Sequence, residues 1–390
     1  MLEVIKRRRG RHLKIVSMEP TPSPYSMKVN LNETLENNQT ENYKQSDDLE
    51  AAPTYIQELF TIHGIKGLYR VVDFITIERN PRVPWEEILP EVRKIIGTEE
   101  ETMDLFSVQS NNKEEAFGEV KVNIQMIRDI PTQVKLQEGD NEERFALPER
   151  FMNVAMEAAT ASNNYLMERR WVEFSPRYGK MQEIGHDVVE EISATYSEDR
   201  LAELLDVALE KKASAEVTHQ DALTTDMLDK EDWRERYALL AQMPDPTEAD
   251  YPVLDKALDD DHSSVRRLAT AYLGMIEEPE TLPYLYKALQ DKSVNVRRTA
   301  GDCISDLGFT EAIPEMIKTL TDKSRIVRWR GAMFLYEVGD ESAIPALEAA
   351  LEDTEFEVRM QAKMALSRIQ AGKAGEGSIW AQMAQAAKEK

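Results

Sequence analysis

Residues 260–273 read DDHSSVRRLATAYL, and the pattern of this stretch returns along the C-terminal part of the 390-residue chain. An aspartate, a Val-Arg pair and a small residue recur at intervals of 31 residues. The recurring charged residues are Asp260, Arg266, Asp291, Arg297, Asp322, Arg328, Asp353 and Arg359. Repeats of this length are supersecondary units that bury their apolar faces only by stacking on one another. The pattern therefore predicts a helical solenoid over residues 231–370.

Each repeat is predicted to contain two helices. The first carries the pattern Val-Arg-x-x-Ala-x-x-x-Leu over residues 265–273, and the second begins near a proline that recurs with the same period. A helix tolerates proline in its first turn, because the N–H that proline lacks has no partner there. This pattern resembles the short HEAT repeats of the phycobilisome-lyase type. The resemblance implies an all-α, armadillo-like solenoid, and the alternative of bilin-lyase chemistry finds no distinct bilin pocket in the sequence.

The periodic charges are interpreted as a structural ladder. In HEAT-like arrays an aspartate of one repeat meets an arginine of its own or the next repeat, and ion pairs at a fixed register specify stacking. Some proteins that resemble this fold are enzymes, and deoxyhypusine hydroxylases bind iron through His-Glu dipeptides. None of the five histidines in this chain is followed by glutamate. We therefore expect no iron chemistry of this kind in the chain.

Residues 13–98 are predicted to form a small α+β domain. Residues 19–24 read Glu-Pro-Thr-Pro-Ser-Pro, residues 64–77 form two runs rich in β-branched and aromatic side chains, and residues 85–96 carry one helical stripe. These motifs resemble the N-terminal domain of Nfu/NifU scaffold proteins, which usually have asparagine at the position of Ser23. The prolines either stop edge-to-edge pairing of sheets or form a lip that binds a partner.

This resemblance implies a fold and a protein-docking role, and it does not extend to cluster chemistry. In longer Nfu proteins the cluster-binding CxxC motif lies in a separate downstream domain. The present chain has a single cysteine, Cys303, so it can form neither a CxxC pair nor an all-cysteine iron–sulfur site. The phase of Cys303 in its repeat predicts a small, buried and inert thiol. We expect no cofactor.

The composition limits the partners and the location of the protein. The chain carries 48 basic and 72 acidic residues, a net charge of −24, which repels phosphate backbones and disfavours nucleic acid as a partner. No apolar run is long enough to span a bilayer. The basic start is not followed by the apolar segment of a signal peptide. We therefore predict a cytoplasmic protein with protein partners, in which residues 1–12 are a disordered basic tail.

A second α+β domain is predicted over residues 118–212, between polar linkers at 99–117 and 213–230. Arginines beside aromatic rings can bind an anionic group or an acidic peptide of a partner. Alternatively, they pair with neighbouring glutamates and cover the core with their aliphatic stems. The candidate residues of this domain are Arg169, Arg170, Trp171, Arg177 and Tyr178.

Two Glu-x-x-His motifs, at residues 183–186 and 216–219, raise the alternative of a metal-dependent enzyme. This spacing places two ligands on one helix face, and two such motifs can build a di-iron site in a four-helix bundle. However, the chain is rich in glutamate, Gly185 weakens the first helix, and the second segment has few apolar residues. We therefore predict no metal site.

The order of the three modules resembles the conserved virulence factor C family of Gram-positive bacteria. That family implies a cytoplasmic protein that influences the production of haemolysins and other exoproteins. No P-loop, GxGxxG or HExxH motif occurs in the chain. We predict a multidomain, non-enzymatic scaffold or adaptor that binds proteins through its HEAT repeats and its N-terminal domain. The alternative is an accessory role in iron–sulfur cluster assembly or delivery without a bound cluster. Residues 371–390 are predicted to be a flexible tail with a short terminal helix.

Overall fold

A computed structural model describes residues 13–21, 23–35, 40–97, 119–139, 141–161, 164, 167–209, 222–373 and 375. These residues form two compact units. The first comprises the described residues of Met1–Phe117 together with Leu347–Met364, and the second comprises those of Gly118–Ala346 and Ala365–Lys390. The boundary between the units therefore falls within the last two helices of the repeat pattern.

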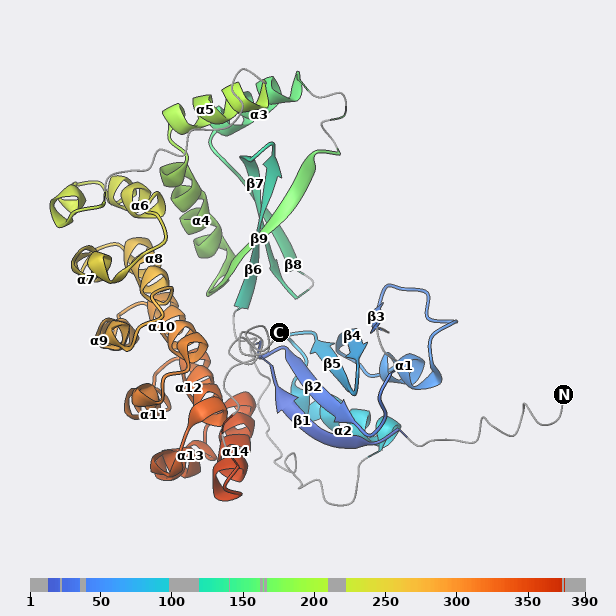
Figure 1. Ribbon diagram of the computed structural model, residues 1–390. Coiled ribbons are helices and arrows are strands. Elements are labelled where there is room, and N and C mark those ends of the chain that lie inside the picture. Colours follow the sequence, from blue (N-terminus) through green and yellow to red (C-terminus); the bar gives the residue numbers. More distant parts are fainter. Residues whose placement is uncertain are drawn as a thin grey trace. The chain divides into compact units, whose positions relative to one another are not determined.

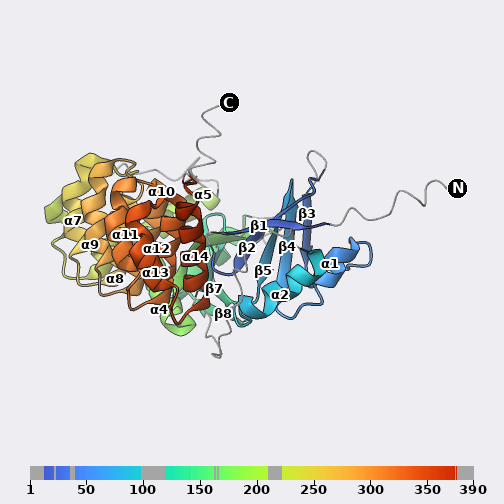
Figure 2. The same ribbon diagram turned by 90° about the horizontal axis from the view of Figure 1, so that it is seen from below.

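The first unit is built on a five-stranded antiparallel sheet with the strand order β1-β2-β5-β4-β3. The strands are β1 (Ile15–Pro20), β2 (Ser26–Leu31), β3 (Thr40–Lys44), β4 (Ile65–Val71) and β5 (Phe74–Arg79). Two helices, α1 (Thr54–Leu59) and α2 (Trp85–Ile96), lie on one face of this sheet (Figure 2). The beginning of the proline-rich stretch lies at the end of the edge strand β1, where a missing N–H costs no ladder hydrogen bond.

Every second side chain of β2 is buried, and these side chains join the strand to the core. Met27, Val29 and Leu31 are buried on the helix-covered face, while the residues between them are only half-buried. Helix α2 presents one buried apolar stripe toward this face, and Pro90 lies inside the helix without ending it. The result is a two-layer α+β domain, as the sequence predicts.

The second unit begins with a four-stranded antiparallel sheet in the order β8-β7-β6-β9. The strands are β6 (Glu119–Ile127), β7 (Ile130–Glu138), β8 (Asn141–Ala146) and β9 (Arg169–Tyr178). Helices α3 (Glu149–Ala159) and α4 (Met181–Thr195) pack on β7, and α5 (Glu198–Ala208) packs on α3. Val120, Val122 and Ile124 alternate along β6 and are fully buried in this core.

Gly185 has a packing role in α4. A Cβ atom at this position would overlap the ring of Phe145 on β8, so only glycine lets the helix approach the sheet this closely. Helix α4 runs unbroken through Gly185 because Met181, Ile184 and Val188, which lie on the same face of the helix, are buried in the core. The cost of glycine in a helix is offset by this close contact.

Helix pairs fill the rest of the second unit and continue into the first. The helices are α6 (Trp233–Ala241), α7 (Tyr251–Leu258), α8 (Ser263–Leu273), α9 (Leu282–Leu289), α10 (Val294–Leu307), α11 (Ile313–Thr319), α12 (Arg325–Val338), α13 (Ile344–Ala350) and α14 (Phe356–Gln370). Short 3-10 turns are η2 (Thr225–Leu228), η3 (Glu248–Asp250), η4 (Pro279–Thr281), η5 (Thr310–Ala312) and η6 (Glu341–Ala343). In Figure 1, α7, α9 and α11 form one layer, and α8, α10 and α12 form the other.

The small residue of each repeat allows its helix to pack closely on the preceding helix of the array. A Cβ atom at Gly331 in α12 would overlap the hydroxyl of Thr319 in α11. Ala269 and Ala300 occupy the same repeat position and are fully buried. The predicted fold class is confirmed: an N-terminal α+β domain, an α+β middle domain and a solenoid of helix pairs.

Candidate functional site

The periodic arginines and aspartates form a hydrogen-bonded ladder in the second unit. Arg266 on α8 donates through Nε and Nη2 to the carboxylate of Asp291 in the next repeat, at 2.6 and 3.0 Å. Its Nη1 donates to the backbone carbonyl of Asp260 in its own repeat, at 2.8 Å. Arg297 repeats this geometry with Asp322, at 2.8 and 3.0 Å. Each guanidinium thus joins two successive repeats through a bidentate, charge-assisted contact.

Each ladder aspartate also shapes the turn that precedes its helix. The Oδ1 atom of Asp291 accepts the backbone N–H of Ser293 at 2.6 Å, and Asp322 accepts that of Ser324 at 2.7 Å. Asp353 makes the same turn with Glu355 at 2.9 Å. Short carboxylate side chains favour such turns. The aspartate is therefore used twice, once in its own turn and once as the acceptor for an arginine.

The ladder begins one repeat earlier than the 31-residue register indicates. Arg236 on α6 donates to the carboxylate of Asp260 at 2.5 and 2.9 Å, and its Nη1 donates to the carbonyl of Lys230 at 2.6 Å. Arg236 precedes Arg266 by 30 residues, one fewer than the regular period, so it escapes a search at fixed spacing. Arg328 keeps the own-repeat contact, from Nη1 to the carbonyl of Asp322 at 2.9 Å.

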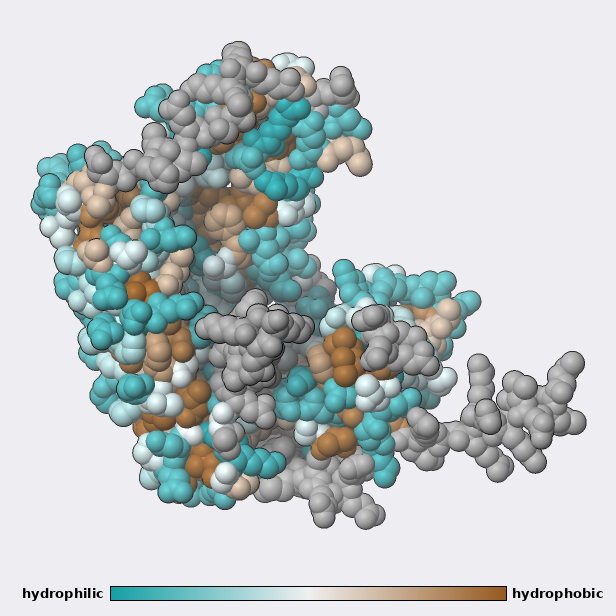
Figure 3. Space-filling view, in the orientation of Figure 1, coloured by the Kyte–Doolittle hydropathy of each residue, from teal (hydrophilic) through white to brown (hydrophobic). Residues whose placement is uncertain are grey.

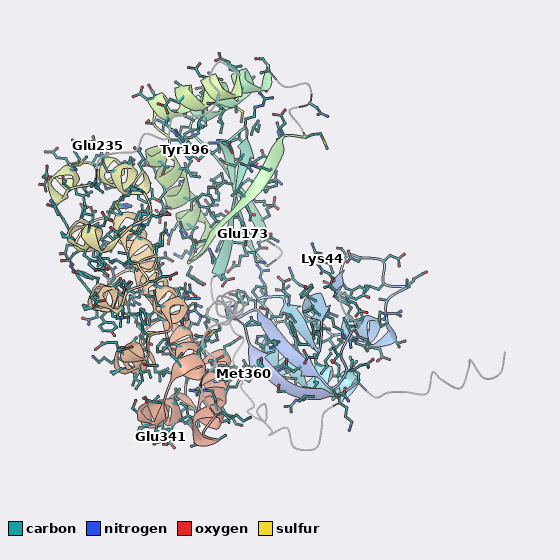
Figure 4. All side chains as sticks on the ribbon, in the orientation of Figure 1. Lys44, Glu173, Tyr196, Glu235, Glu341 and Met360 are labelled. Carbon is teal, nitrogen blue, oxygen red and sulfur yellow. The ribbon has the colours of Figure 1, made fainter. Side chains whose placement is uncertain are left out.

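The five candidate residues on β9 do not form one surface. Arg169, Arg170 and Trp171 are exposed, as is Glu173, which Figure 4 labels on the same stretch. The ring of Trp171 is 36% exposed and lies 4.5 Å from the Lys135 ammonium group. Two candidates at the other end of β9, Arg177 and Tyr178, are buried, with 7% of each residue exposed. Only the first three are therefore available to a partner or an anion.

Arg177 belongs to a buried ionic cluster centred on Glu191 of α4. The Oε2 atom of Glu191 accepts hydrogen bonds from Arg177 Nη2 at 3.0 Å and from Arg267 Nη2 on α8 at 3.1 Å. The hydroxyl of Tyr237 on α6 donates to the same oxygen at 3.4 Å. Glu191 is 6% exposed. One carboxylate thus connects β9 and α4 of the middle domain to helices α6 and α8 of the repeat array.

The charges of this cluster keep Glu191 ionised. Burial acts to raise the pKa of Glu191, but the nearby guanidinium groups of Arg267 and Arg177 outweigh burial and hold that pKa below its ordinary value. An ionised carboxylate is the stronger acceptor for three donors. The same two arginines would be left without their common partner if Glu191 were neutral.

The hollow beside the cluster is very small. It is lined by Arg177, Asp187, Glu191, Arg267 and Asn295 among others, and its volume is about 20 Å³. This is room for about one water molecule. Pockets that bind small organic ligands measure about 300–1,000 Å³. The ionisable groups therefore converge on each other rather than on a space for a substrate.

A second buried contact joins the end of β9 to α10. The backbone N–H of Tyr178 donates to Asn295 Oδ1 at 3.1 Å, and its hydroxyl donates to Glu119 Oε2 at 3.2 Å. The Arg298 guanidinium lies 5.2 Å from the Tyr178 ring centroid. Burial lowers the pKa of Arg298 to about 10, and raises that of Tyr178 to about 12. At neutral pH Arg298 remains a cation over a neutral phenol, a favourable cation–π arrangement.

The residue that follows each ladder arginine distinguishes the repeats that make these contacts from those that do not. Arg267 and Arg298 directly follow the ladder arginines of two successive repeats, giving Val-Arg-Arg twice, whereas the next two repeats have Trp329 and Met360 there. The residue after a ladder arginine lies on a different helix face. In the first two full repeats that face is occupied by the middle domain.

The described residues of the Glu-x-x-His motifs and the single cysteine make ordinary structural contacts. Glu183 pairs with Lys180 at 3.3 Å, and the His186 ring packs edge-to-face on Phe145, whereas Glu216 and His219 lie outside the described residues. Within the described part of the chain, no three His, Cys, Asp or Glu side chains are grouped as metal ligands. Cys303 is half-buried rather than buried as its phase predicts, and desolvation of its thiol raises the pKa to about 12, so the thiol is protonated at neutral pH.

Among the helices that the structure describes, none combines the length and apolar character needed to cross a lipid bilayer.

Family models match three parts of the chain. The model described as Scaffold protein Nfu/NifU N terminal matches residues 16–102, and the one described as Virulence factor matches residues 125–205. The model of HEAT repeats matches residues 221–300 and 283–367. Together with the fold, these matches define a multidomain protein with an Nfu-type scaffold domain, a virulence-factor domain and a HEAT-repeat solenoid.

Similar proteins narrow this class. The Bacillus subtilis (strain 168) protein described as Uncharacterized protein YpgR is 53% identical over 273 residues, covering 69% of this chain and 71% of the relative. Conserved virulence factor C of Staphylococcus aureus (strain USA300) is 41% identical over 274 residues, covering 70% and 72%. The crystal structure of Staphylococcus aureus protein SAV1430 is 32% identical with a TM-score of 0.20, covering 21% of this chain and 96% of that one. The chain belongs to the conserved virulence factor C family, as its module order predicts. Its HEAT repeats are typical of a protein-interaction role.

Proposed function

We propose that this protein is a non-enzymatic adaptor that binds other proteins through its repeats and its N-terminal domain. We further propose that these interactions influence the production of virulence factors, in keeping with the name of its staphylococcal relatives. The adaptor acts through surfaces held in a fixed geometry, and no bound cofactor takes part.

The Glu191 cluster is the observation that carries this proposal. Converging buried ionisable groups are a common mark of an active site. Here the three donors on Glu191 Oε2 come from three different elements, β9, α6 and α8, and the adjoining hollow holds about one water. The cluster is suited to join the middle domain to the repeats, so that both present their outer surfaces in a fixed arrangement.

The outer surface of the repeats combines apolar patches with a periodic row of lysines. Figure 3 shows hydrophobic patches between hydrophilic side chains along the repeat helices. Lys256, Lys287 and Lys318 stand 31 residues apart on α7, α9 and α11. Their side chains are 37%, 37% and 67% exposed. A partner that lies along the array meets the same kind of side chain in each repeat.

Affinity purification of the full chain from cells tests the adaptor role. We expect a stoichiometric protein partner that is retained at moderate salt. Replacing Lys256, Lys287 and Lys318 together by glutamate changes the exposed face of three repeats, and the control replaces the exposed Lys121 and Lys180 of the middle domain. Selective loss of the partner in the repeat variant supports binding through this face. Recovery of no partner with the unaltered chain contradicts the proposal.

The match to the Nfu/NifU scaffold model supports a second candidate, an accessory role in iron–sulfur cluster assembly or delivery. In this role the N-terminal domain binds an assembly protein, since a single cysteine cannot hold a cluster alone. Deletion of the gene should then lower the activity of cluster-dependent enzymes such as aconitase, and a copy lacking the N-terminal domain should fail to restore it. Unchanged cluster-enzyme activity in the deletion strain would rule this candidate out.

A further inference from the structure

The last ladder arginine has an unusual carboxylate partner. Arg359 on α14 makes the own-repeat contacts of the ladder, donating through Nη1 to the carbonyls of Asp353 at 2.7 Å and Thr354 at 2.9 Å. Its Nη2 donates to Glu86 Oε1 at 3.2 Å. Glu86 lies in the first turn of α2, in the N-terminal domain. Arg359 and α2 belong to the same compact unit.

The register of the sequence explains why Arg359 needs a partner from elsewhere. Arg266 and Arg297 each take the aspartate that lies 25 residues further along. For Arg359 the corresponding position is residue 384, which is an alanine. Glu86 therefore supplies the carboxylate that the pattern of the following residues lacks.

A second, more deeply buried ion pair accompanies this contact. Arg79 at the end of β5 pairs with Glu357 on α14, and the two side chains are 2% and 1% exposed. The Arg79 guanidinium lies 5.4 Å from the ring centroids of both Tyr25 and Trp85, and its Nη1 donates to the carbonyl of Val83 at 2.6 Å. Three residues of the N-terminal domain, Tyr25, Val83 and Trp85, thus hold one guanidinium against the last repeat.

We propose that the N-terminal domain caps the last repeat within the same chain, with Glu86 serving as the ladder carboxylate of a missing repeat. Terminal repeats of a solenoid need a polar covering that closes their apolar end. The acidic first turn of α2 fits this role because Arg359 keeps the Nη1 contacts of the other ladder arginines to its own repeat and reaches Glu86 through Nη2. The N-terminal domain therefore has a structural task in this chain besides any docking of external partners.

A charge-reversal cycle in the full chain tests the cap. Glu86→Lys and Arg359→Glu each place like charges together, while the double variant restores an opposite pair with its polarity reversed. The readout is hydrogen–deuterium exchange of the α14 peptide that covers residues 356–364. We expect exchange in this peptide to accelerate about tenfold or more in each single variant. The double variant should recover most of the protection.

Two further variants keep the test specific. Glu91→Lys makes the same change of charge on α2, but Glu91 pairs with Lys94 on an exposed face, so exchange in α14 should stay unchanged. Glu357→Gln removes the charge that faces Arg79 with little change of shape, and it should accelerate exchange in α14 as well. Unchanged exchange in both single variants, or a double variant no better protected than the singles, would overturn the cap. Strands β6 and β7 report whether the second unit stays folded in every variant.

Discussion

The ladder and the Glu191 cluster use buried arginines in opposite ways. In the ladder, one guanidinium spans two repeats, and the same contact recurs at Arg236, Arg266 and Arg297. In the cluster, three donors from three elements depend on one carboxylate oxygen. The ladder distributes its stabilisation over many equivalent contacts, whereas the cluster concentrates it in a single residue. The repeat array should therefore tolerate the loss of one contact better than the join to the middle domain does.

The largest expected effect is that of Glu191→Gln. This change leaves Arg177 and Arg267 buried without their common counter-charge, which costs about 3–5 kcal/mol when one partner of a buried ion pair is removed. Hydrogen exchange in α4 and α6 measures the local free energy of opening. The matched control is Glu190→Gln on the same helix, because Glu190 makes a partly exposed pair with Arg234 at 2.6 Å. Equal effects of the two changes would contradict the central role of Glu191.

Glu337 on α12 should give the stability of the protein a pH dependence opposite in sign to that of Glu191. Burial raises the pKa of Glu337 to about 7, and the Arg330 guanidinium only partly offsets this. The folded state therefore binds the Glu337 proton more tightly than the unfolded state, so this group's contribution is fully present at low pH. It is lost as pH rises from the ordinary carboxyl pKa through about 7. Glu337→Gln removes this dependence. As pH rises from 5 to 8, the free energy of unfolding of the variant should therefore increase relative to that of the wild type by up to about 3 kcal/mol.

Urea unfolding at several pH values, followed for the wild type and Glu337→Gln, checks this sign. Parallel curves for the two proteins would show that Glu337 does not titrate with a raised pKa. The same series on Glu191→Gln should behave oppositely. The pKa of Glu191 is held below its ordinary value, so its contribution is lost as pH falls.

The ladder could be predicted from the sequence because its contacts repeat at a fixed interval. A periodic Asp and Arg imply a periodic contact even when the helices have not been placed in space. The cluster could not be predicted, because Arg177, Glu191, Tyr237 and Arg267 share no spacing and meet only when α4 packs on α6 and α6 packs on α8. The sequence also treats Arg169 and Arg177 as one group, although β9 carries one into solvent and the other into the core.

The 31-residue spacing does not predict the ladder contact of Arg236. Its spacing of 30 residues to Arg266 breaks the period by one, yet the guanidinium reaches Asp260 with the same bidentate geometry. A one-residue deletion between helices is absorbed by the connecting turn, which the sequence pattern does not reveal. The fold class and the α+β character of both domains follow from alternation and helical stripes, which are local signals.

A smaller effect is expected for Arg297→Lys in the middle of the ladder. Lysine keeps the charge but loses the planar fork that bonds Asp322 and the carbonyl of Asp291 together. We expect a loss of about 1–2 kcal/mol in the free energy of unfolding, measured by urea denaturation. Arg144→Lys, in an exposed pair with Glu142, is the matched control and should change stability by less than about 0.5 kcal/mol. A loss for Arg297→Lys no larger than that of the control would contradict the structural role of the ladder.

The smallest effect on stability is expected for Trp171→Ala. Trp171 lies on the exposed half of β9, and its contacts are the Lys135 ammonium group and the Arg144 guanidinium at 4.5 and 5.8 Å from the ring centroid. Exposed cation–π contacts contribute about 0.5–1 kcal/mol, so the melting temperature should hardly change. If this half of β9 docks a partner, the yield of complex in affinity purification should fall while the fold is intact. A large loss of stability would show that Trp171 is part of the core instead.

Cross-linking mass spectrometry of the native protein in cells tests the central claim most directly. The lysines report different surfaces: Lys256, Lys287 and Lys318 the second helices of successive repeats, and Lys121 and Lys135 the middle sheet. The account predicts cross-links from one stoichiometric protein partner to lysines of several successive repeats. Cross-links confined to copies of this chain, together with tight binding and turnover of a small molecule by the purified protein, would contradict it.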